Sequence, residues 1–106
     1  MKTNRDNAPA RYVPPDEWDY TDRHPVGSFT IEEEGGERDL IARLPDGSYG
    51  TCPLLPRSGS GPSWFFNGDL ERPTLRPSVR QLGTTGQGKT FERWHGWLKD
   101  GEWVSC

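Results

Sequence analysis

The residues best suited to chemistry lie near the C-terminal end of this 106-residue chain. Asp100-Gly101, between strand-like residues, predicts a two-residue hairpin turn. A hairpin centred on this turn pairs His95 with Cys106, and directly opposed residues have Cβ atoms roughly 4.5–5.5 Å apart on one face of a sheet. An imidazole beside a thiol is either part of a metal site or a nucleophile with its base.

A metal site needs more ligands than this pair, because structural zinc is held by about four protein ligands. The further soft ligands in the sequence are Cys52 and His24, together with the carboxylate that Cys106 would carry. The alternative is structural: a lone histidine on an edge strand is satisfied by one hydrogen bond, and a free cysteine behaves as a small hydrophobe. Two cysteines in a chain without an export signal predict free thiols rather than a disulfide.

A catalytic Cys–His pair is another interpretation, with Cys106 or Cys52 as the nucleophile and His95 as its base. An activated thiolate requires an electropositive, partly enclosed setting, and the sequence indicates neither that setting nor a third, orienting group. The sequence therefore predicts no catalytic residue and a protein that is not an enzyme.

Residues 83–90 match the phosphate-binding pattern G-x-x-x-x-G-K-[ST] through Gly83, Gly88, Lys89 and Thr90. That pattern binds phosphate where it connects a buried strand to a long helix. Here the following segment is strand-like, so the loop is interpreted as a flexible connection.

Three arginines, Arg72, Arg76 and Arg80, share parity along a segment that is expected to be extended. They predict a charged strand face that pairs with the acidic region 28–46, with single-stranded nucleic acid as the alternative ligand. The net charge of −3 disfavours nucleic acid as a partner.

The elements that must position these residues are short strands. With 13 Gly and 10 Pro in the chain, a long helix is excluded, and no apolar run approaches the roughly 20 residues of a membrane span. The N-terminus also lacks the apolar run of a signal peptide. Strands are expected at residues 28–32, 39–44, 48–54, 63–67, 91–98 and 102–105, with an extended segment at 73–82. This predicts an all-β protein, a small antiparallel meander forming a sandwich or open barrel.

Residues 1–27 read as an extended N-terminal arm that precedes a β domain at 28–106. The arm holds four prolines and too few apolar residues to form a core of its own. Tyr12, Trp18 and Tyr20 are its predicted anchors, either on its own domain or on a neighbouring chain.

Residues 49–106 resemble a family of small uncharacterised domains of phages and prophages, some of which carry the label ammonia monooxygenase. The shared pattern is Trp64-x-Phe66-Asn67-Gly68, Pro73-Thr74-Leu75-x-Pro77-Ser78-Val79, His95-x-Trp97, Asp100-Gly101 and Cys106. The resemblance implies a zinc-like site in which Cys52, His95 and Cys106 carry over. Leu55 and Trp94 stand where the family has two further cysteines. The cofactor prediction is accordingly none, with zinc as the alternative.

Taken together, these observations predict a phage-encoded, non-enzymatic protein–protein interaction module, such as a virion accessory or minor structural protein. One alternative is an inhibitor of a host defence or regulatory protein that binds through Glu32, Glu33, Glu34 and Glu37. Another is a zinc-stabilised module with a degenerate Cys/His site. The expected partners are viral structural proteins or a second copy of the chain, in the host cytoplasm or the virion, with no membrane.

Overall fold

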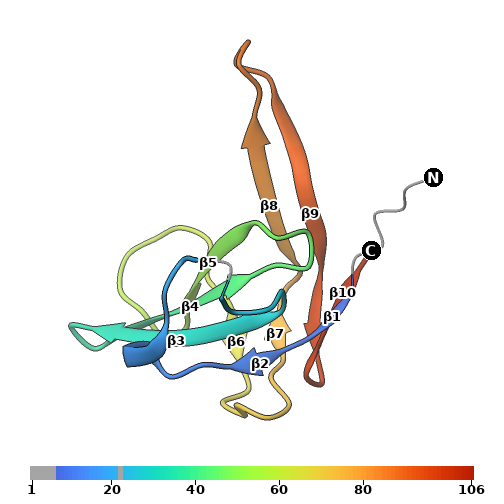
Figure 1. The fold of residues 1–106 in the computed structure, drawn as a ribbon. Coiled ribbons are helices and arrows are strands. Elements are labelled where there is room, and N and C mark those ends of the chain that lie inside the picture. Colours follow the sequence, from blue (N-terminus) through green and yellow to red (C-terminus); the bar gives the residue numbers. More distant parts are fainter. Residues whose placement is uncertain (1–6, 22) are drawn as a thin grey trace.

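The fold consists of two four-stranded β-sheets and one two-stranded sheet (Figure 1). The computed structural model describes residues 7–21 and 23–106. In chain order the elements are β1 (Ala8–Pro9), β2 (Arg11–Tyr12), the 3-10 turn η1 (Pro15–Glu17), β3 (Ser28–Glu34), β4 (Glu37–Arg43), β5 (Tyr49–Leu54), β6 (Phe65–Phe66), β7 (Leu75–Arg76), β8 (Val79–Thr84), β9 (Thr90–Lys99) and β10 (Glu102–Ser105). The predicted all-β class is confirmed. No helix in the described residues has the length and apolar character needed to cross a membrane.

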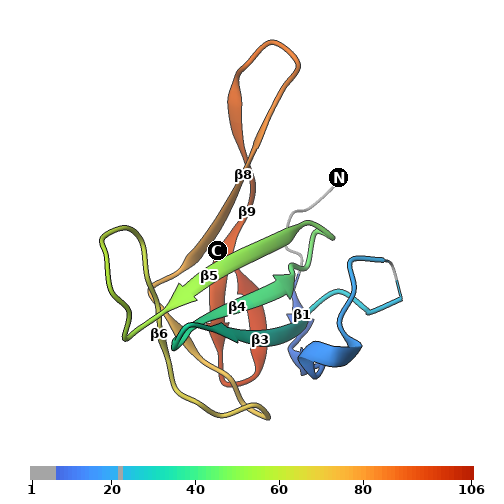
Figure 2. The same ribbon diagram turned by 90° about the vertical axis from the view of Figure 1, so that its left-hand side faces the viewer.

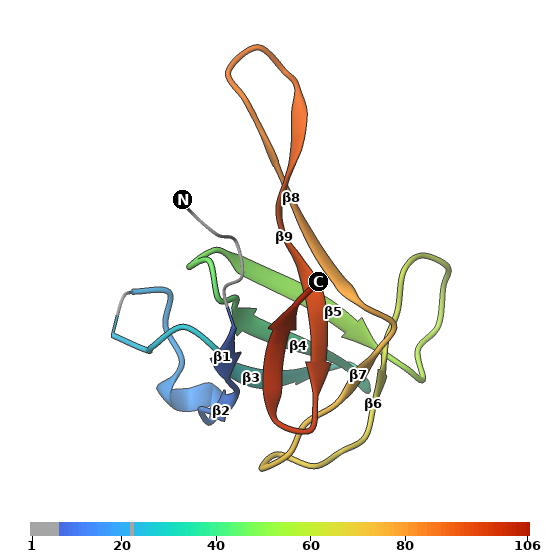
Figure 3. The same cartoon turned by 90° about the vertical axis from the view of Figure 1, so that its right-hand side faces the viewer.

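The two larger sheets have the strand orders β2-β3-β4-β5 and β1-β10-β9-β8. Their pairings are antiparallel apart from the short parallel pair β2–β3. Figures 2 and 3 show the sheet of β3, β4 and β5 lying across the lower part of β9 and β10. The fully buried side chains of Phe29, Leu40 and Leu54 from the first sheet and Leu98 and Trp103 from the second belong to the same hydrophobic core.

The C-terminal hairpin has the predicted register. Lys99 pairs with Glu102, and the backbone N–H of Cys106 donates to the carbonyl of His95 at 3.0 Å. The turn residues Asp100 and Gly101 have φ of 47° and 83°, which is the left-handed conformation that a type I′ turn requires at both positions.

Replacing Gly101 with alanine is expected to destabilise the fold by about 1–2 kcal/mol. The positive φ strains any L side chain, and an added Cβ would lie 3.2 Å from the carbonyl oxygen of Glu71. Urea unfolding measures the change. A midpoint equal to that of the unmodified protein would contradict this account of the turn.

The N-terminal segment is extended and lies on its own domain. Ala8 pairs with Trp103, and Tyr12 pairs with Phe29. Trp18 stacks on His24, with ring centroids 5.2 Å apart. Tyr20 packs edge-on against Tyr49 at 5.0 Å, although 59% of Tyr20 remains exposed. The described part of the arm is therefore anchored within the chain, the first of the two placements expected, and the predicted arm residues 1–6 and 22 lie outside the described residues.

The predicted row of three arginines is wrong, because the segment 72–80 is not one continuous strand. β7 ends at Arg76 and β8 begins at Val79 in a different sheet. The Arg76 guanidinium lies over the Phe65 ring at 5.9 Å, whereas Arg80 pairs with Glu92. The glycine-rich residues 85–89 form the turn of the β8–β9 hairpin, which projects from the body in Figure 1. The chain continues from this turn into a strand and not into a helix, as the sequence analysis expected.

Candidate functional site

The side chains of Ser78 and His95 meet at the base of the β8–β9 hairpin. Ser78 Oγ lies 3.1 Å from His95 Nε2, which is hydrogen-bonding distance. Ser78 directly precedes β8, and the register pairs Val79 with Gly96 and Arg80 with His95. Ser78 is therefore the diagonal neighbour of His95 on one face of the sheet, within reach of an imidazole.

The backbone around Ser78 is held from outside the sheet. The indole N–H of Trp64 donates to the carbonyl of Ser78 at 3.1 Å. Asn67 fixes the chain that leads to it: its Oδ1 accepts the N–H of Thr74, and its amide donates to the carbonyl of Arg72. The Trp64 and Asn67 positions of the sequence pattern thus position the segment that carries the serine.

The other nitrogen of the imidazole faces a carboxylate. His95 Nδ1 lies 3.7 Å from Glu92 Oε2. When Nε2 accepts the Ser78 hydroxyl proton, the ring proton is on Nδ1 and points toward this carboxylate. The order serine, histidine and carboxylate is the arrangement that activates a hydroxyl nucleophile.

A β-bulge places Glu92 on the same face as His95. In a regular strand, residues three apart point to opposite faces. Here Gln81 pairs with Trp94 and Leu82 pairs with Glu92, so Arg93 is an extra residue in β9. Such a bulge shifts the alternation by one residue. As a result, Glu92, Arg80 and His95 share one face.

Arg80 is the second partner of the same carboxylate oxygen. Its Nε lies 3.0 Å from Glu92 Oε2. Glu92 therefore sits between a guanidinium and an imidazole. All three side chains are partly exposed, so water reaches the site from the outer face of the sheet.

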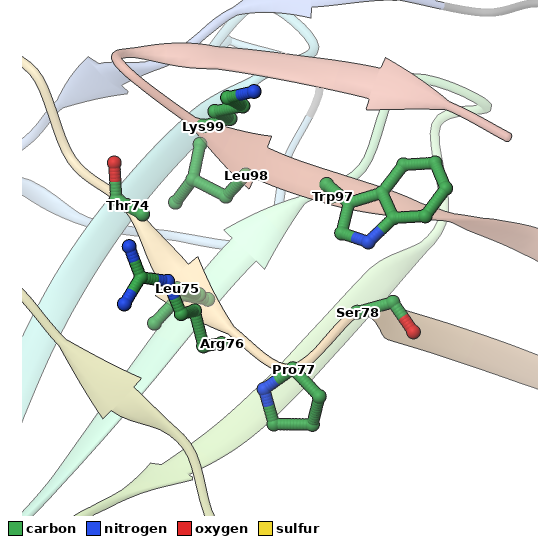
Figure 4. Close-up of a pocket in the computed structure, with 8 residues that line it drawn as sticks. All are labelled: Thr74, Leu75, Arg76, Pro77, Ser78, Trp97, Leu98 and Lys99. Carbon is green, nitrogen blue, oxygen red and sulfur yellow. The ribbon is translucent and has the colours of Figure 1, made fainter.

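A groove adjoins Ser78 on the side away from Glu92. It has a volume of about 740 Å³. Figure 4 shows Ser78 and Trp97 at one end and Thr74 and Lys99 at the other. The eight lining residues are Thr74, Leu75, Arg76, Pro77, Ser78, Trp97, Leu98 and Lys99. The groove is large enough for several residues of an extended peptide.

The residues predicted to bind metal are not gathered into one site. Cys52 is buried in the core and pairs with Leu40 in the other large sheet. Cys106 is exposed, and its thiol donates to the backbone carbonyl of His95 at 3.4 Å rather than to the ring. Among residues 7–21 and 23–106, no group of three His, Cys, Asp or Glu side chains is placed to hold a metal ion. Zinc as a cofactor stays a prediction.

The two thiols differ in their ability to react. Burial, followed by the nearby charge of Asp39, raises the pKa of Cys52 to about 12. We expect Ellman's reagent to titrate one thiol, that of Cys106, in the folded protein and two in guanidinium chloride. The Cys106→Ser variant provides the control and should show no fast-reacting thiol. Rapid reaction of a second thiol in the folded state would contradict the burial of Cys52.

The glutamates predicted to bind a partner lie on β3 and β4, in the large sheet that does not contain His95. Glu32, Glu33 and Glu34 are at the outer end of β3, where all three are exposed. Glu37 is engaged within the chain by Arg57 at 3.1 Å and by Ser58. The hydrogen bonds from the Ser58 side chain and backbone lower the pKa of Glu37. Tyr12 packs against Phe29 at 5.6 Å, so it serves the core.

The sequence analysis missed Ser78 and Glu92 as functional residues. His95 was singled out, but its hairpin partner Cys106 was considered in place of the serine. The available signal was the segment Pro73-Thr74-Leu75-x-Pro77-Ser78. In it the serine directly follows a proline-constrained segment and precedes a strand. For Glu92 there was no signal, because the bulge at Arg93 is visible only in the pairing of β8 with β9.

Comparison with protein families matches residues 16–106 to a family described as "Bacterial ubiquitination-like system serine protease (BubE)". No curated protein and no solved structure matches the chain significantly. The family match spans the end of η1 and every strand from β3 to β10, and therefore includes Ser78, Glu92 and His95. Since the match extends over far more than half of its length, the chain belongs to the BubE family.

Proposed function

We propose that this chain is a serine peptidase with Ser78 as the nucleophile, His95 as the general base and Glu92 as the carboxylate that orients the imidazole. The observation that carries the proposal is the 3.1 Å separation of Ser78 Oγ and His95 Nε2 in a member of a serine protease family. Its substrates would be protein components of a bacterial ubiquitination-like system.

The reaction follows from the positions of these groups. Ser78 Oγ attacks the carbonyl carbon of a peptide bond while His95 Nε2 takes the hydroxyl proton. His95 Nε2 then gives this proton to the leaving amine, and the C–N bond breaks to leave an ester on Ser78. Water, deprotonated by the same imidazole, attacks the ester carbonyl. Release of the carboxylic acid returns the proton to Ser78 Oγ.

Glu92 supports this cycle by stabilising the imidazolium that forms after each proton transfer. Its carboxylate is close enough to Nδ1 to favour the tautomer in which Nε2 accepts. Because the ion pair is partly exposed, this stabilisation is weaker than that from a buried carboxylate.

Replacing Arg80 with glutamine is expected to lower kcat about two- to fivefold with little change in KM. The arginine holds the Glu92 oxygen that faces His95, and an exposed ion pair contributes about 0.2–1 kcal/mol. Steady-state peptide hydrolysis measures the effect. The Arg93→Gln variant is the control, because this neighbouring arginine lies over the Phe91 ring rather than beside Glu92. Equal kcat values for Arg80→Gln and the unmodified protein would contradict a positioning role.

Family membership overturns the functions predicted from the sequence. A phage-encoded virion or accessory module is wrong, and so are an inhibitor of a host protein and a zinc-stabilised module without enzymatic activity, because the family is one of serine proteases from bacterial systems. The family description does not address zinc itself, which stays a prediction. The prediction that the protein is not an enzyme is wrong for the same reason. The expectation of a protein partner agrees with a family that works in a ubiquitination-like system.

A fluorophosphonate probe tests the proposed nucleophile, because it phosphonylates serine hydroxyls that a neighbouring base activates. We expect one label per chain, located on the peptide that contains Ser78, and no label in Ser78→Ala. The matched control is Ser60→Ala, which removes an exposed loop serine and should leave labelling intact. Labelling that persists in Ser78→Ala, or no labelling of the unmodified protein, would contradict the proposal.

A further inference from the structure

We propose that the groove beside Ser78 binds an extended peptide with an apolar side chain next to the cleaved bond and a carboxylate about four residues away. This inference rests on the proposed function, because it takes Ser78 as the point of cleavage. It specifies the substrate chemistry that this site selects.

The apolar part of the groove lies next to the serine. Trp97 is 45% exposed and lines the groove beside Ser78, whereas Leu75 and Leu98 are buried in its floor nearer Thr74 and Lys99 (Figure 4). Figure 4 shows Trp97 and Pro77 flanking Ser78 from opposite sides of the groove. An apolar substrate side chain at this end would cover the exposed indole and remove apolar surface from water.

The far end of the groove carries positive charge. Arg76 and Lys99 line it, and both side chains are exposed. Within the part of the chain that the structure describes, neither forms an ion pair: Arg76 lies over the Phe65 ring, and Lys99 has no carboxylate within salt-bridge distance. None of the eight described residues that line the groove is acidic. Its charge therefore complements an acidic substrate residue.

The strand geometry gives the spacing between the two parts. His95, Trp97 and Lys99 alternate with the buried Gly96 and Leu98 along β9, so they share its outer face. With about 3.3 Å per residue, Lys99 lies roughly 13 Å from His95 along the strand. An extended peptide covers this distance with about four residues. The groove is therefore continuous with the Ser78–His95 pair and ends at the cationic pair.

Binding to the Ser78→Ala protein tests the proposal without cleavage. The probes are fluorescein-labelled Gly/Ser peptides with one central leucine and a single glutamate four residues before or after it. The matched probes carry lysine in place of glutamate. By fluorescence polarisation we expect one glutamate peptide to bind about fivefold more tightly than its lysine counterpart. This preference should shrink in about 1 M salt, where charges are screened beyond roughly 3 Å.

The double variant R76E/K99E, made in the Ser78→Ala protein, should reverse the preference, whereas Lys89→Glu should not. Lys89 is an equivalent control, since it is an exposed lysine in the turn of the projecting hairpin. Equal binding of glutamate and lysine peptides, or an unchanged preference in R76E/K99E, would overturn the proposal. Labelling by the fluorophosphonate probe is measured separately on the native protein. If the protein is labelled but does not prefer glutamate peptides, the result refutes only the proposed ligand of the groove. Acidic selectivity without labelling refutes only the peptidase.

Discussion

Replacing His95 with alanine is expected to lower kcat for peptide hydrolysis by about 10⁴-fold. The imidazole is the group that lies within 3.1 Å of Ser78 Oγ, so its removal leaves the hydroxyl without a base and the leaving amine without an acid. KM should change little, because His95 is not among the residues that line the groove. Initial rates on a quenched fluorescent peptide measure both constants.

The chain offers a matched control for this substitution, because it has two histidines. His24 lies in the N-terminal segment, where its ring stacks on Trp18 and its Nε2 accepts the backbone N–H of Asp19 at 3.3 Å. His24→Ala should keep kcat within about twofold, since it touches neither Ser78 nor the groove. A His95→Ala protein that retains more than about a tenth of the native kcat would exclude His95 as the general base.

Local sequence rules predicted the C-terminal hairpin well. Asp100 and Gly101 both adopt the positive φ that a two-residue turn requires, and this turn determines the register of β9 against β10. These are short-range constraints, and they act within a few residues of the turn. The strand at 28–32 followed for the same reason, because alternation of Phe29 and Ile31 is a local signal.

The site depends on constraints that are not local. Ser78 reaches His95 because β8 begins at Val79 and pairs with β9 in one particular register. Glu92 joins them because of one extra residue in β9, and no residue pattern around Arg93 indicates a bulge. The sequence therefore located the imidazole but not its two partners.

The predicted lack of enzymatic activity rested on the two cysteines, for which the sequence indicates neither an activating setting nor an orienting third group. That argument did not consider a serine nucleophile, and the candidate serine site needs little buried volume. Ser78, Glu92 and His95 lie on the outer face of a two-strand ladder, and the core beneath them is provided by large aromatic residues such as Trp94 and Trp103. A surface triad with an open groove is compatible with a core of this size.

Replacing Trp103 with alanine is expected to destabilise the protein by about 3–5 kcal/mol. The side chain is fully buried and meets Trp94 edge-on at 5.9 Å. Its indole N–H donates to the carbonyl of Gly27 at 3.0 Å, a contact between residues 76 positions apart. The loss therefore combines a large cavity with a broken link between β10 and the chain entering β3.

Gly27 shows why this link is sensitive. Its φ is 94°, and a Cβ there would lie 2.2 Å from the backbone carbonyl oxygen of Pro9, so the N-terminal segment packs directly against it. Removing the Trp103 indole leaves this crowded junction without the side chain that holds it to the second sheet. Small domains have unfolding free energies of about 5–15 kcal/mol, so a loss of this size removes between about a fifth and all of the stability of Trp103→Ala.

Guanidinium chloride unfolding followed by circular dichroism measures this effect, and two variants separate its causes. Trp103→Phe keeps most of the buried ring but removes the hydrogen bond to Gly27, so a loss of about 1–2 kcal/mol is expected. Trp97→Ala removes a tryptophan that is 45% exposed and should change stability by less than about 1 kcal/mol while weakening peptide binding in the groove. If Trp103→Ala and Trp97→Ala had equal free energies of unfolding, the result would contradict the role of Trp103 in joining the two sheets.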